Sequence, residues 1–181
     1  MLDITHGEWV ELHLGVVGSP SGSGLVLLDG DEDETRVVFR GYAPDFESDD
    51  RREALAIITA KRCLQSVFGY PNEEAYWLDE RGSLGIGIYE LIGSMWAENV
   101  AIFNDRTYWR DKQEHRDFLA SHGISEMGPI HSSQLRHFFI GSKDSSVQLL
   151  AEELLVEIID GKSFGEVISE AVHRMLNSTC D

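Results

Sequence analysis

The first forty residues contain three segments with the apolar patterns of β-strands, beginning with an alternation of apolar and polar side chains that is typical of a half-buried strand. Residues 9–17 alternate in this way, residues 25–28 form a short apolar run, and residues 35–40 are rich in β-branched and aromatic side chains. Asp29-Gly30 opens an acidic turn between the last two segments, and this dipeptide is typical of tight hairpins. The pattern predicts an N-terminal β-meander.

The middle of the chain predicts further strands and one helix. Residues 84–92 and 135–141 are short apolar segments that favour strands, and a short helix is expected from about Met95 to Phe103. Residues 54–68 fit either a strand or a helix. Residues 43–52 are polar and indicate a loop, and residues 105–133 are polar without a clear period and indicate a long surface excursion.

The C-terminal third contains one ambiguous segment and one clear helix. Apolar side chains between residues 147 and 158 recur at helical spacing, whereas Val156, Ile158 and Ile159 favour a strand, so both alternatives stay open. Ser163 and Glu166 form a capping-box pattern before an apolar face, which predicts a terminal helix over about residues 164–176. Together these elements predict a single α+β domain over residues 1–181. It consists of an antiparallel sheet, built from the N-terminal meander and the central and C-terminal strands, and a few helices.

The charge balance is strongly acidic, with 32 carboxylate side chains against 15 basic ones and a formal net charge of −17. Such a field repels phosphates and anionic membranes, so direct binding to nucleic acid or membrane is not expected without a basic patch, and no such patch is visible. The same field attracts a basic protein. The two cysteines do not form a disulfide framework, no secretory signal is visible, and no apolar run approaches the roughly 20 residues of a membrane span. A cytoplasmic protein is expected.

Known motifs for metals and cofactors fail when tested residue by residue. Asp29, Asp31 and Asp33 have the spacing of a calcium loop, but Glu34 stands where the sixth position needs glycine, and Arg40 where the twelfth needs glutamate. The glycines between residues 18 and 24 lack the Lys-Ser/Thr pair of a phosphate-binding loop. We therefore expect no metal and no cofactor.

Polar residues beside the predicted strands remain as candidate site residues. A histidine and a carboxylate brought together can perform general acid–base catalysis, although Lys143-Asp144 is also a good turn. The candidate catalytic residues are His137, Asp144 and Glu90, and the candidate ligand-binding residues are Asn72, Glu73, Tyr89 and Trp96.

Several of these residues belong to segments that resemble a family of small uncharacterised bacterial proteins. The segments are Phe68-Gly69-Tyr70-Pro71-Asn72-Glu73-Glu74-Ala75, Gly87-Ile88-Tyr89-Glu90-Leu91 with Ser94 and Trp96, Arg136-His137-Phe138-Phe139-Ile140, and Asp144-Ser145. The family pattern runs roughly FGYPNDEA, YEVxNSxW, RHxI and HDSTFE. The resemblance implies a common fold but no reaction, and it favours strand for residues 146–159. Lys143 stands where the pattern has histidine and Gln148 where it has glutamate, which weakens an enzymatic interpretation.

Three hypotheses follow. The first is a non-enzymatic binding or regulatory protein, of the immunity or inhibitor kind, whose acidic surface engages a basic protein partner. The second is a small-metabolite enzyme with a His/carboxylate pair. The third is an inhibitor that mimics nucleic acid, which requires carboxylates along one elongated surface.

Overall fold

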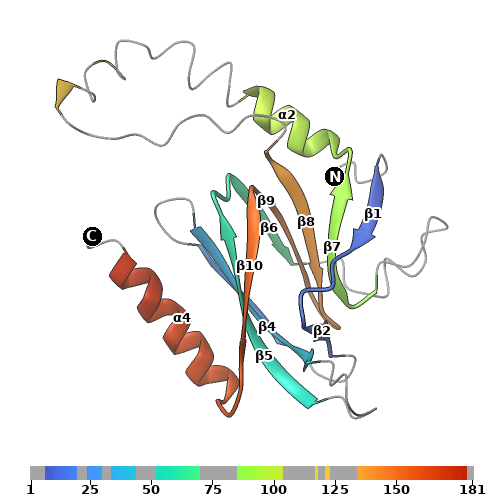
Figure 1. The fold of residues 1–181 in the computed structure, drawn as a ribbon, viewed down its shortest axis with the longest axis vertical. Helices are drawn as coiled ribbons and strands as arrows, with labels where there is room; N and C mark the ends of the chain where they lie inside the picture. Colours follow the sequence, from blue (N-terminus) through green and yellow to red (C-terminus); the bar gives the residue numbers. More distant parts are fainter. Residues whose placement is uncertain are drawn as a thin grey trace.

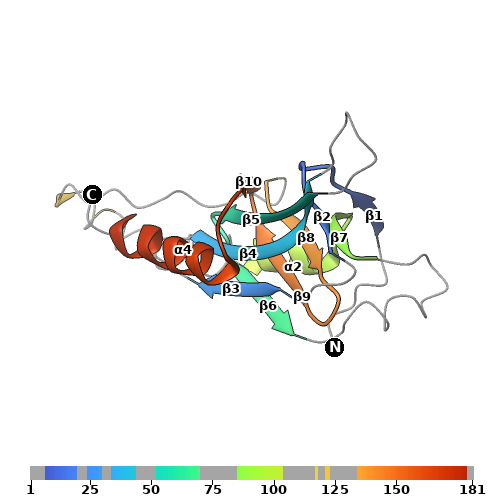
Figure 2. The same cartoon turned by 90° about the horizontal axis from the view of Figure 1, so that it is seen from below.

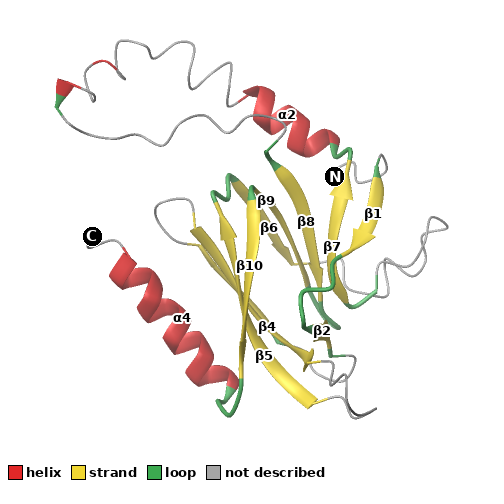
Figure 3. Ribbon diagram, in the orientation of Figure 1, coloured by secondary structure: helices red, strands yellow, loops and turns green. Residues whose placement is uncertain are grey.

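The computed structural model describes residues 7–19, 24–29, 34–43, 52–69, 85–103, 117, 121–122 and 134–178. These residues form two antiparallel sheets and two helices, which confirms the predicted α+β class (Figure 1 and Figure 3). In chain order the elements are β1 (Glu8–Glu11), β2 (Val17–Gly18), β3 (Leu25–Asp29), β4 (Glu34–Ala43), β5 (Arg52–Lys61), β6 (Gln65–Gly69), β7 (Gly87–Ile92), α2 (Met95–Phe103), β8 (Arg136–Gly141), β9 (Ser146–Ala151), β10 (Glu153–Ile159) and α4 (Phe164–Ser178).

The first sheet has the order β1-β7-β8-β9-β6, and the second has the order β10-β5-β4-β2, with β3 also paired to β4. The β3–β4 pairing confirms the predicted hairpin, although residues 30–33 of its acidic turn lie outside the described residues. Segment 54–68, which fitted a strand or a helix, forms β5 and β6.

Side chains of the two sheets meet in a shared hydrophobic core, because alternate residues of each strand point to opposite faces. Val37, Phe39 and Ile58 of the second sheet pack with Phe138 and Leu149 of the first, and all five are fully buried. The intervening residues point to the outer faces of the two sheets, where the helices lie.

Helix α4 covers the outer face of the second sheet, as both views of the ribbon show (Figure 1 and Figure 2). Val167 and Ala171 on its buried side pack against Val38 and Ile57. The predicted capping box is confirmed at its first turn, since the backbone N–H of Ser163 donates to Glu166 at 2.7 Å. The hydroxyl of Ser163 also donates to the same carboxylate at 2.6 Å.

The ambiguous segment 147–159 forms two strands, β9 and β10. Between them the chain passes from the first sheet to the second. Strand β9 pairs with β6 and β8 in the first sheet, and β10 pairs with β5 in the second. Beside this crossing, Arg62 adopts a left-handed conformation (φ 48°) and pairs with Glu152 at 2.8 Å. The helical spacing of the apolar residues therefore arises from two consecutive strands, because β9 is buried on both faces and β10 turns Leu154 and Val156 towards the shared core.

Helix α2 has the predicted bounds and lies beside the outer face of the first sheet, where Ala97 and Ala101 pack with Leu135 and Leu150. Within the described ranges, no helix has both the length and the apolar character needed to cross a membrane. The predicted excursion over residues 105–133 lies almost entirely outside the described residues.

Candidate functional site

The connection between β7 and α2 is a sharp turn made by Gly93 and Ser94. Gly93 has φ 76°, a left-handed conformation that glycine adopts without a steric penalty. Ser94 is the N-cap of α2, since its Oγ accepts the backbone N–H of Ala97 at 3.2 Å. The carbonyl of Ser94 accepts the N–H of Glu98 at 3.1 Å, which begins the helical hydrogen bonding. The buried hydroxyl of Ser94 is thereby fixed at the edge of the first sheet.

His137 lies next to this turn, on β8, in register with Leu91 of β7. Its side chain points to the outer face and is 1% exposed. The Nδ1 atom of His137 lies 2.8 Å from Ser94 Oγ, and its Nε2 atom lies 3.0 Å from Oε1 of Gln148 on β9. The rings of Trp96 and Trp9 meet the imidazole edge to face, with ring centroids at 5.0 Å and 5.6 Å. The imidazole is thus held by hydrogen bonds at both ring nitrogens and by contacts with two indole rings.

Burial and the hydrogen bond to Gln148 together define the protonation state of His137. An amide oxygen only accepts, so Nε2 carries the proton and donates to Gln148, and the hydroxyl of Ser94 donates to Nδ1. Burial lowers the pKa of His137 to about 4, while the hydrogen bond to Gln148 opposes that shift. His137 is therefore neutral at pH 7.

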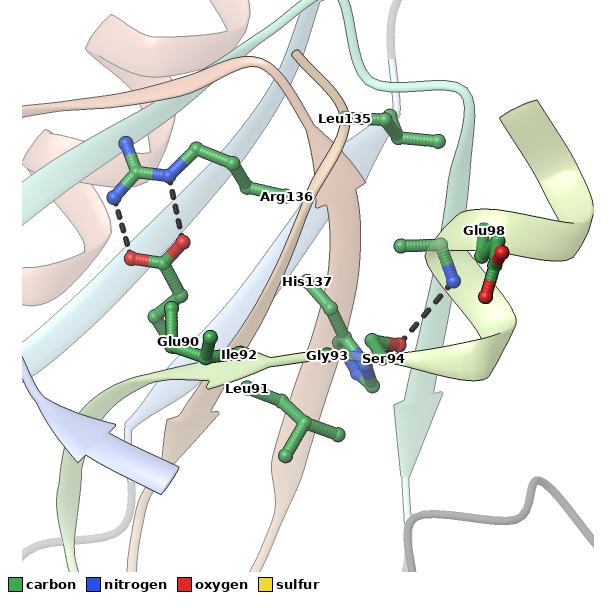
Figure 4. Close-up of a pocket in the computed structure, with 10 residues that line it drawn as sticks. Glu90, Leu91, Ile92, Gly93, Ser94, Glu98, Leu135, Arg136 and His137 are labelled. Atoms are coloured by element: carbon green, nitrogen blue, oxygen red, sulfur yellow. Dashed lines mark hydrogen bonds and ion pairs between the residues drawn. The ribbon is translucent and has the colours of Figure 1, made fainter. Parts of the chain in front are cut away.

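Glu90 and Arg136 form an ion pair on the opposite side of the same two strands (Figure 4). Arg136 Nε donates to Glu90 Oε1 at 2.8 Å, and Nη2 donates to Oε2 at 2.5 Å. The guanidinium also lies over the ring of Phe138, 4.8 Å from its centroid. The hydrogen bond to Glu90 raises the pKa of Arg136. Both oxygens of Glu90 are thus engaged, which leaves it poorly placed to act as an acid or base.

An open cavity of about 410 Å³ lies at this end of the first sheet, between β7, β8 and the start of α2. Leu91, Ile92 and Leu135 form its apolar walls, and Ser94 and His137 both line it (Figure 4). Glu98 of α2 lines the cavity as an exposed carboxylate. Among the described residues, no group of three or more histidine, cysteine or carboxylate side chains has the arrangement of a metal site.

The structure does not bring the proposed acid–base pair together. His137 stands at the start of β8, whereas Asp144 lies in the turn beyond its end, where the Ser142 N–H donates to the Ser145 carbonyl at 2.9 Å. Gly141 lies four positions after His137 along the strand, a distance of about 13 Å before the turn begins. Asp144 therefore occupies a turn, the alternative that its sequence allowed.

The remaining candidates have separate positions. Glu90 and His137 line the same cavity, but from opposite faces of the sheet. Glu90 is bound to Arg136, and His137 is bound to Gln148. Tyr89 packs against Phe139 on the outer face, with ring centroids at 6.1 Å, and does not line the cavity. Trp96 packs on His137 and donates its indole N–H to Gln65 at 2.9 Å. Asn72 and Glu73 lie outside the described residues.

Sequence reasoning did not assign a role to Ser94, Gln148 or Trp9, which complete the surroundings of His137. The available signal for Ser94 was local, since a Gly-Ser pair follows a predicted strand and precedes a predicted helix. No local signal pointed to Gln148 or Trp9, because both reach His137 only through strand pairing.

Comparison with known proteins adds no relative to this description: no family model, no curated protein and no solved structure matches the chain.

Proposed function

We propose that this protein binds a basic protein partner through exposed carboxylates at the cavity end of the first sheet. The proposal starts from the surplus of 32 acidic over 15 basic side chains. A surplus of this size directs association only where the carboxylates are not already neutralised by neighbouring cations.

The described basic side chains are largely occupied by intramolecular partners. Most lie in ion pairs on the second sheet, on α4 or at the crossing between the sheets, and one lies beside the cavity. They are Arg36, Arg40, Lys61, Arg62, Arg136, Lys162 and Arg174. These cations neutralise particular carboxylates and leave the others to dominate the surface field.

Two exposed carboxylates at the cavity end make no ion pair with any residue whose side chain the structure describes. Glu8 lies on β1, in register with the cavity residue Ile92, and Glu98 lies on α2. We call these two residues the acidic rim. Glu11 of β1 is also exposed, but it lies in register with Tyr89, away from the cavity, and the pKa of Tyr89 is raised by burial and, secondarily, by Glu11.

The acidic rim is the observation on which the proposal rests. Uncompensated carboxylates accelerate encounter with a basic surface, and they lose this effect as salt screens the charges, over a Debye length of about 10 Å at 0.1 M ionic strength. Exposed apolar side chains next to the rim, Val10 and Ile92, provide contact area once the partner has docked.

Affinity capture from native lysate at low and high salt, followed by measurement of the dissociation constant for the recovered protein, tests the proposal. Glu8→Gln and Glu98→Gln are each expected to weaken binding several-fold at low salt, with little further loss at high salt. Asp144→Asn is the matched control, because it removes the same charge from an exposed turn at the other end of β8. Equal weakening by all three variants would show that net charge alone, and not the acidic rim, governs association.

A further inference from the structure

Ser94 occupies a strand–turn–helix position that is known from enzymes with a serine nucleophile. Strand β7 ends at Ile92, Gly93 turns the chain in a left-handed conformation, and α2 begins at Met95. In α/β-hydrolases the nucleophilic serine is held on a sharp turn of this kind between a strand and a helix. Here the turn places Ser94 on the wall of the cavity, with its hydroxyl bound to His137.

A base and a group that orients the base are both within hydrogen-bonding distance. The hydroxyl of Ser94 donates to Nδ1 of His137 at 2.8 Å, and Nε2 of His137 donates to Gln148 at 3.0 Å. This chain of hydroxyl, imidazole and orienting side chain is the arrangement that activates a serine nucleophile. The neutral imidazole is in the form that accepts a proton.

The start of α2 also supplies donors for a developing negative charge. Ser94 is the N-cap, so the backbone N–H groups of Met95 and Trp96 in the first turn have no acceptor within the helix. The positive end of the helix dipole lies at the same point. Because these groups follow Ser94 directly, they suit the oxyanion that forms when a hydroxyl attacks a carbonyl carbon.

The cavity restricts the substrate. Its volume of about 410 Å³ and the walls formed by Leu91, Ile92 and Leu135 suit a small acyl group. Glu98 on the wall disfavours anionic substrates. A small carboxylic ester, neutral or cationic, fits both features.

We propose that Ser94 is the nucleophile of an acyl-transfer site, with His137 as its general base and Gln148 as a positioning residue. Ser94 Oγ attacks the carbonyl carbon of the ester while its proton passes to His137 Nδ1. The tetrahedral intermediate collapses to an acyl-serine, and the alcohol leaves with the proton held by His137. Water then attacks the acyl-serine by the same route, releasing the carboxylic acid and restoring the Ser94 hydroxyl.

Covalent labelling tests this proposal independently of partner binding. The folded protein is incubated with a small fluorophosphonate, which loses fluoride when a serine oxygen attacks phosphorus, and the adduct is located by peptide mass spectrometry. A single adduct on Ser94 is expected, together with hydrolysis of p-nitrophenyl acetate above the buffer rate. Absence of a Ser94 adduct on the folded wild-type protein would overturn the proposal.

The variants separate catalysis from the capping role of Ser94. Ser94→Asn keeps a good N-cap but removes the nucleophile, so labelling and hydrolysis should vanish in a protein that still unfolds in one cooperative transition. His137→Gln should slow labelling about 100-fold or more, the usual effect of losing a general base. Labelling of Ser94 at the wild-type rate in His137→Gln would refute the role of His137.

Gln148→Glu provides the readout that a purely structural network would not give. A carboxylate beside Nε2 stabilises the imidazolium that forms during attack, so ester hydrolysis should rise at least about tenfold. The lower midpoint of the pH–rate profile should also move to higher pH. A folded Gln148→Glu protein without a rate increase or a shift in that profile would contradict the assignment of Gln148.

Discussion

The buried imidazole of His137 should make the stability of the protein depend on pH in a defined window. The pKa of His137 is about 4 in the folded protein, against an ordinary value of 6.5. Between these two values the unfolded chain binds a proton at this position and the folded protein does not. The contribution of His137 to stability is therefore complete above pH 6.5 and is lost as pH falls towards 4.

The size of this effect follows from the shift itself. The shift spans about two and a half pH units, each equivalent to about 1.4 kcal/mol, so the free energy of unfolding should fall by about 3 kcal/mol between pH 7.5 and pH 4 through this one group. The cause is desolvation, because the side chain of His137 is 1% exposed and Trp9 and Trp96 pack on its ring. Glu90 and Glu98 also line the adjacent cavity.

Urea unfolding of the wild-type protein and of His137→Gln at a series of pH values separates His137 from these carboxylates. The variant has no imidazole but retains both glutamates, so any contribution from them cancels in the difference between the two proteins. His137→Gln should be clearly less stable at pH 7.5, where it loses the aromatic packing, and the gap should narrow by about 3 kcal/mol at pH 4. A gap that stays constant across this range would refute the proposed neutral, desolvated histidine.

Further substitutions test the fold. Ser163→Ala removes the capping box of α4 and should cost about 1 kcal/mol in chemical denaturation, whereas Ser169→Ala, on the exposed side of the same helix, should change stability by less than about 0.5 kcal/mol. Phe138→Ala empties a fully buried position and should cost about 3–5 kcal/mol in the same assay, and a loss below 1 kcal/mol would contradict the shared core. Gly41→Ala places a Cβ 2.2 Å from a backbone oxygen and should lower the thermal midpoint. Gly165→Ala meets nothing within 4 Å in α4 and should raise that midpoint slightly.

The helices were the most predictable elements because their signals are local. The expected bounds of α2 agree with the structure, and the capping residues before α4 mark its first turn. A helix forms its hydrogen bonds within one segment, so the residues that begin and end it are neighbours in the sequence. The β3–β4 hairpin was predictable for the same reason.

Segment 147–159 shows where local patterns become insufficient. Its apolar spacing fits a helix as well as two short strands, and the choice depends on whether partner strands are present. β9 pairs with β6 on one side and with β8 on the other, and β10 pairs with β5. These partners come from distant parts of the sequence, so the local pattern left the alternative open.

The candidate site was predictable only in part. His137 and Glu90 do line one cavity, but Glu90 is bound to Arg136, and Asp144 lies at the far end of β8. The partners of His137 are Ser94, the N-cap of α2 directly after β7, and Gln148 on β9. Strands β7 and β9 are the two neighbours of β8. A one-residue change in register would turn Gln148 to the opposite face, and nothing in its local sequence specifies that register.

The sequence by itself determined the α+β composition, the positions of helices α2 and α4 and the acidic balance of the molecule, because these depend on residue type and on contacts within one segment. Only the tertiary structure decided which strands pair, which carboxylates keep their charge free of a cation, and which polar side chains meet at His137. These outcomes depend on the register and facing of strands that are far apart in the chain. The register and facing of these strands are determined by burial of the core that the two sheets share, and no single segment specifies them.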